Sequence, residues 1–109
     1  MHFLAEYLGK KLVVDPVIYG DAQREIKKIA IVSGGGGLGG LEDAFACGCD
    51  LLITGEFDHT MYHPQKEMNV NVISLGHYAS ETVGPYAVMQ KIRETFGIPV
   101  EFINIPTGL

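Results

Sequence analysis

Four short apolar segments constrain the fold of this chain more than any other feature. We predict that each is a β-strand, and they cover residues 28–33, 50–54, 70–75 and 100–105. These segments are continuous apolar runs rather than alternating ones, which is typical of strands covered on both faces. Helical patterns separate them, at residues 41–46, 57–68 and 86–96. We therefore predict an α/β fold: a mostly parallel sheet with helices on both faces, a three-layer sandwich.

The first 27 residues are less regular. Residues 4–8 suggest a short helix ended by Gly9, and residues 12–14 suggest a short strand broken by Pro16. We therefore divide the chain into an irregular lead-in, residues 1–27, and an α/β domain, residues 28–109, which carries the candidate site residues described below.

Composition narrows the function classes. The chain has 109 residues, 47% of them hydrophobic, which is enough for one domain with a core. A net charge of −5 argues against nucleic-acid binding. No apolar run approaches the roughly 20 residues of a membrane span, and no signal peptide is recognisable. Cys47 and Cys49 are too close for an ordinary disulfide, so we expect reduced thiols and a cytoplasmic protein, with metal binding as the lesser alternative.

In parallel α/β sheets, ligands gather at the carboxyl ends of the strands. A glycine run, residues 34–40, follows the first predicted strand of this domain. It formally satisfies G-x-G-x-x-G, but six glycines in seven positions make that match nearly automatic. Three interpretations remain open: a tight strand-to-helix turn, an anion site at a helix N-terminus, or a dinucleotide site. Gly35, Gly36 and Gly37 are the candidate substrate-binding residues.

Acids and histidines follow the next two strands. Glu56 comes after the second, where it would position a metal-bound water or cap the next helix. His63 is a candidate to line the site, with an ordinary solvated histidine as the alternative.

The third strand is followed by His77 and Glu81, four residues apart. On a helical turn both side chains point the same way, and together they make half of a divalent metal site. The alternative is a helix cap. Zinc, iron, manganese and nickel all suit this pair.

Several blocks occur in a characteristic order: Ser-Gly-Gly-Gly at 33–36, Thr-Gly-Glu at 54–56, Gly-His-Tyr-Ala-Ser-Glu at 76–81 and a final apolar stretch before Pro106. From residue 28 to 106 the chain resembles the C-terminal part of the Nif-three-like dinuclear-metal proteins, also named GTP cyclohydrolase 1 type 2 homologues. The resemblance implies an α/β sandwich, a toroidal homohexamer and two metal ions. It also implies that His77 and Glu81 are metal ligands.

The resemblance also shows what this sequence lacks. Family members are about twice as long or more, and their N-terminal half carries a paired-histidine motif and an aspartate ligand. This chain has neither, so it resembles a fragment, a split gene product or a half whose partner lies elsewhere. We expect half of a dinuclear site of hydrolase type, activating water on a substrate such as a nucleotide-like compound. The alternatives are a non-catalytic metal-binding or oligomeric assembly module with a protein partner, and a nucleotide-binding domain.

Overall fold

The computed structural model describes all of residues 1–109 and contains one four-stranded sheet. Its strands lie in the order β1-β4-β3-β2 and comprise β1 (Val17–Tyr19), β2 (Ile29–Val32), β3 (Leu51–Thr54) and β4 (Asn71–Ser74). The strands β2, β3 and β4 are parallel, while β1 pairs with β4 in the antiparallel sense. The predicted mostly parallel sheet is therefore confirmed.

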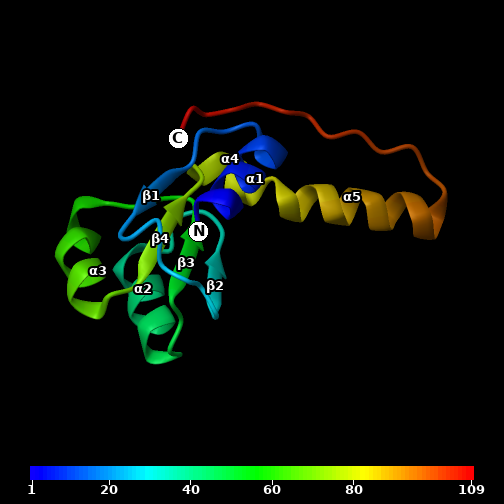
Figure 1. The fold of residues 1–109 in the computed structure, drawn as a ribbon. Coiled ribbons are helices and arrows are strands. Elements are labelled where there is room, and N and C mark those ends of the chain that lie inside the picture. Colours follow the sequence, from blue (N-terminus) through cyan, green and yellow to red (C-terminus); the bar gives the residue numbers. More distant parts are fainter.

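Helices precede, connect and follow these strands (Figure 1). They are α1 (His2–Leu12), α2 (Gly37–Ala46), the 3₁₀ turn η1 (His59–Met61), α3 (Tyr62–Met68), α4 (His77–Glu81) and α5 (Val83–Phe96). Pro64 lies in the first turn of α3, where its missing N–H has no intrahelical partner to lose. No helix in the structure is both long enough and apolar enough to cross a membrane.

The two faces of the sheet bury separate apolar clusters. Leu52 of β3 packs into a cluster with Leu41 of α2 and Met61 of η1. Its neighbour Ile53 belongs to the opposite cluster, which includes Ala5 of α1. Successive side chains of a strand point to opposite faces, so this short central strand anchors both layers. The predicted three-layer arrangement is confirmed.

The first 27 residues are more regular than the sequence suggested. The helix α1 continues past Gly9 to Leu12, and Val13 ends it in the left-handed conformation (φ 58°), so the strand expected at 12–14 is wrong. A Cβ at Gly9 would lie 2.8 Å from Pro16, so this glycine serves close packing inside the helix rather than ending it. The unexpected strand β1 extends the sheet.

The C-terminal region differs most from the prediction. The helix α5 begins at Val83, three residues earlier than expected, and residues 100–105 form no strand. Figure 1 shows α5 projecting from the sheet, with the chain returning beside it toward α4. The molecule consequently measures 50 × 26 × 26 Å, and its radius of gyration is 15.4 Å. A compact domain of this length would have a radius of about 13 Å.

Candidate metal centre

Three turns meet at the carboxyl ends of the parallel strands. Gly34 follows β2, Gly55 follows β3, and Gly76 lies between β4 and α4. The Gly55 N–H donates to the Gly34 carbonyl and the Gly76 N–H donates to the Gly55 carbonyl, each over 2.9 Å. These bonds join the three turns into one platform beneath the side chains of His77, Glu81 and Glu56.

His77 is the centre of this group. Its Nδ1 lies 2.9 Å from Oε1 of Glu56, and its Nε2 lies 3.4 Å from Oε1 of Glu81. The helical turn of α4 explains the second contact, because side chains four residues apart share one helix face. The His77 side chain is 39% exposed, so a ligand can reach the pair from solvent.

The two contacts of His77 assign different roles to its nitrogens. When Nδ1–H donates to Glu56, Nε2 carries the lone pair and faces Glu81. Two donors on one tetrahedral ion, with bonds of about 2.0–2.2 Å, lie about 3.3–3.5 Å apart. The observed 3.4 Å between Nε2 and Oε1 fits two ligands of one ion.

Negative charge surrounds the imidazole on both sides. The hydrogen bond to Glu56 raises the pKa of His77 above its ordinary value, and the carboxylates of Glu81 and Glu56 act electrostatically in the same direction. Partial desolvation opposes this shift. The same carboxylates that favour an imidazolium also favour a bound cation.

Two hydroxyl side chains hold the platform in place, and the sequence analysis did not single them out. The Gly34 N–H donates to Ser80 Oγ, and the Ser80 hydroxyl donates to the His77 carbonyl, both over 2.9 Å. Thr54 donates to the Gly34 carbonyl at 3.2 Å and accepts from Gly36 N–H at 3.3 Å. Both residues are buried. The signal available in the sequence was a small hydroxyl residue at a strand end and within a ligand-bearing helical turn.

The glycine run divides into two parts. A Cβ on Gly35 would lie 2.9 Å from Oε2 of Glu56, and one on Gly36 would lie 3.0 Å from Oγ1 of Thr54. Gly34 is the closest of the run to the proposed ligands, since a Cβ there would collide with the Glu81 carboxylate. By contrast, a Cβ on Gly37, at the start of α2, would meet nothing. The turn therefore brings the backbone of Gly34 and Gly35 against the acidic side chains, and Gly34, with φ +68°, adopts a conformation that favours glycine.

The structure does not bring His63 to this group. His63 is exposed on α3, where its ring packs edge-on against Tyr62 with centroids 5.2 Å apart. Cys47 and Cys49 are free thiols at the end of α2, the first exposed and the second buried. Nowhere in the structure do three or more His, Cys, Asp or Glu side chains converge as a complete metal site. His77 and Glu81 are thus two candidate ligands, and Glu56 contacts His77 from the other side of its ring.

Comparison with known proteins identifies the family of the chain. The model of the Duf34/NIF3 (NGG1p interacting factor 3) family matches residues 1–108, which includes the first 27 residues that the motif resemblance had left out. A GTP cyclohydrolase 1 type 2 homolog of Pyrococcus abyssi is 47% identical over 107 residues. That match covers 97% of this chain and 42% of the relative. A protein of the same name from Deinococcus radiodurans is 41% identical over 93 residues. That match covers 85% of this chain and 35% of the Deinococcus protein.

Solved structures share the fold. The protein TTHA1606 from Thermus thermophilus superposes with a TM-score of 0.85 at 34% identity, covering 97% of this chain and 42% of that one. The protein ybgI gives the same TM-score at 30% identity. This chain spans less than half the length of these relatives. With the family model matching nearly every residue, the chain belongs to the DUF34/NIF3 family.

Proposed function

We propose that this chain supplies half of a divalent metal centre of hydrolase type, with His77 and Glu81 as its ligands. The observation that carries the proposal is the 3.4 Å separation of Nε2 and Oε1. The dinuclear-metal character of the family supports the same assignment. Two ligands leave an ion open, so the proposal includes a second source of donors: another copy of the chain in a homo-oligomer, or a partner polypeptide.

A divalent ion at this position would lower the pKa of a bound water and so supply a nucleophile near neutral pH. The protein's own groups prepare the site for it. With a metal bound at Nε2, the proton of the neutral His77 ring would lie on Nδ1, where Glu56 accepts it over 2.9 Å. The Gly34–Ser80 and His77–Ser80 bonds fix the start of α4 against the glycine turn. Glu56 therefore acts through His77, and its second carboxylate oxygen is a candidate to orient water.

For the substrate we propose a nucleotide-like compound, a choice supported by the printed name of the relatives, GTP cyclohydrolase 1 type 2 homolog. The glycine turn offers a place for an anionic group, because α2 begins at Gly37 with N–H groups that have no helical partner. Gly35 and Gly36 lie between that helix end and Glu56.

Metal titration of the purified chain tests the ligand assignment. We expect Zn²⁺ or Mn²⁺ to bind the natural chain, and binding to fall at least about tenfold in His77→Ala and in Glu81→Gln, since each removes one of two donors. His63→Ala is the matched control and should bind as the natural chain does. Equal binding by all four proteins would refute the proposal.

A further inference from the structure

Residues 98–109, here called the C-terminal strap, run back beside α5 and end near α4 (Figure 1). The strap is anchored at its far end, where the Tyr78 hydroxyl accepts from the Ile105 N–H and donates to Oδ1 of Asn104, both over 2.9 Å. None of the backbone–backbone hydrogen bonds in the structure involves residues 98–108. Within residues 100–105, side chains engage the Val100 carbonyl, which accepts from Arg93 over 3.1 Å, and the Ile105 N–H; the other backbone groups have no hydrogen-bond partner.

Side chains alternate over residues 100–103 as they do in a strand. Val100 and Phe102 are half-buried, and Phe102 stacks on Tyr86 of α5 with ring centroids 4.2 Å apart, whereas Glu101 and Ile103 are exposed. Asn104 and Ile105 are exposed as well, and the exposed fractions of Ile103 and Ile105 are 76% and 70%. Such a segment has apolar side chains on both faces, with one face against a helix and the other in solvent. This is typical of a strand whose neighbouring strands are missing.

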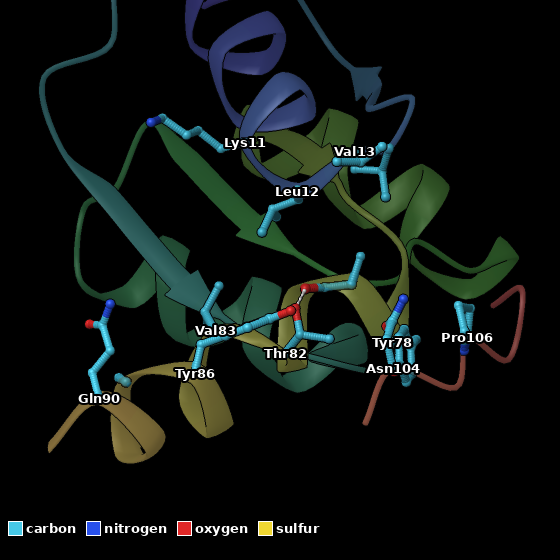
Figure 2. Close-up of a pocket in the computed structure, with 13 residues that line it drawn as sticks. Lys11, Leu12, Val13, Tyr78, Thr82, Val83, Tyr86, Gln90, Asn104 and Pro106 are labelled. Atoms are coloured by element: carbon cyan, nitrogen blue, oxygen red, sulfur yellow. Dashed lines mark hydrogen bonds between the residues drawn. The ribbon is translucent and has the colours of Figure 1, made fainter. Parts of the chain in front are cut away.

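The helix beside the strap is also incompletely covered. None of the 14 residues of α5 is buried, and Val83 and Val88 are more than half exposed. A cavity of about 850 Å³ opens between α4–α5, the end of α1 and the strap. Figure 2 shows Leu12, Tyr86 and Asn104 around it, from these three parts of the chain. An isolated globular domain rarely leaves so much apolar surface along one projecting element.

We propose that residues 100–105 are an edge strand that pairs with a sheet in a separate stretch of polypeptide. That stretch corresponds to the part of the Pyrococcus abyssi relative outside the match. More than half of that protein lies there, since this chain covers 42% of it. The partner is an apolar-faced sheet with a free edge: its backbone pairs with the strap, and α5 covers its face. This inference requires no metal.

The location of the strap links this surface to the metal centre. Tyr78, which holds the strap, directly follows His77 in α4 and also lines the cavity. A sheet paired with the strap would therefore meet α4 at Tyr78, one residue along the chain from the proposed ligand His77.

The test mixes this chain with the purified polypeptide comprising the unmatched part of the Pyrococcus abyssi relative, without added metal. Calorimetry measures the affinity, light scattering the stoichiometry, and amide hydrogen exchange the pairing. The variant Ile103→Pro removes an N–H from the proposed strand. Ile98→Pro is the matched control, since it makes the same change in the strap outside residues 100–105.

We expect a 1:1 complex in which the amides of residues 100–105 become protected from exchange. Ile103→Pro should lower the affinity of the complex about tenfold or more, because it removes one backbone hydrogen bond between the paired strands and distorts the backbone around it. Ile98→Pro should leave the affinity nearly unchanged. The absence of a complex would overturn the proposal. So would a dimer of this chain alone with residues 100–105 already protected, because the occupant would then be a second copy. Metal titration is a separate measurement, so either proposal can fail without the other.

Discussion

At the scale of single residues, the candidate site depends on a chain of contacts that supports the proposed ligands His77 and Glu81. Glu56 holds His77, Ser80 joins His77 to the glycine turn, and Thr54 holds that turn from β3. The sequence indicated Glu56 and His77, together with Glu81, because acids and histidines that follow predicted strands are recognisable. Ser80 and Thr54 offer only the weaker signal of a hydroxyl side chain at a strand end or in a helical turn, since their role depends on contacts with Gly34, which is distant in the sequence.

The role of Glu56 can be tested by one conservative change. In Glu56→Gln the amide can donate to Nδ1, which moves the imidazole proton to Nε2 and blocks the metal-facing nitrogen. We expect metal affinity to fall about 10–100-fold, the range found when partners of metal-bound histidines are changed. Isothermal titration with Zn²⁺ measures this. Glu67→Gln, an exposed change on α3, should have no effect; an equal loss there would refute a specific role for Glu56.

Asp50 provides a test of stability against pH. Backbone N–H groups of Lys27 and Lys28 donate to its carboxylate, and these bonds, aided by Arg24, lower the pKa of Asp50 below its usual 3.8. A carboxyl group with a lowered folded-state pKa stabilises the protein above its unfolded pKa, and this contribution disappears as pH falls through the folded value. We therefore expect Asp50→Asn to unfold at a lower temperature than the natural chain at pH 7.

The difference should shrink as the pH falls below about 4, where Asp50 of the unfolded chain takes up a proton, and should be lost once the pH passes the lower folded-state pKa. Thermal melts followed by circular dichroism at several pH values measure it. A melting-temperature difference that stays constant from pH 7 to pH 3 would contradict the account.

At the scale of elements, the site exists because three strand ends meet without side chains between them. A Cβ on Gly55 would lie 2.6 Å from the Gly34 carbonyl and 2.9 Å from the His77 Cα. Neither neighbour is a flexible side-chain end that could move aside. The strands β2, β3 and β4 were predicted correctly because their apolar runs are bounded by turn residues. Strand β1 was missed because it has only three residues and pairs with β4, far along the chain.

Gly55→Ala should therefore separate the turns. We expect a loss of about 1–3 kcal/mol in unfolding free energy, the usual cost of forcing an extra methyl group into a packed region. Gly39→Ala is the control: it lies within α2, where a Cβ would meet nothing, and should stabilise the helix by about 0.5–1 kcal/mol. Urea unfolding of both variants checks the prediction. A Gly55→Ala variant as stable as the natural chain would contradict close packing at this point.

At the scale of the whole molecule, the α/β sandwich was predictable from the sequence, whereas the projection of α5 and the C-terminal strap was not. Hydrophobic pattern determines which faces become buried, and it identified the sheet and both helical layers. Residues 100–105 have a strand-like composition, but a strand needs a neighbour, and this chain supplies none beside α5. Both proposals, the shared metal centre and the pairing of the strap, call on donors or a strand edge that these 109 residues do not contribute alone.

The most direct test of the metal assignment is anomalous diffraction from crystals of this chain grown with excess Zn²⁺. The account predicts a zinc peak within about 2.0–2.2 Å of both Nε2 of His77 and a carboxylate oxygen of Glu81. Nδ1 should remain bonded to Glu56. Zinc on Nδ1, or well-ordered His77 and Glu81 side chains with no peak between them, would contradict the central claim.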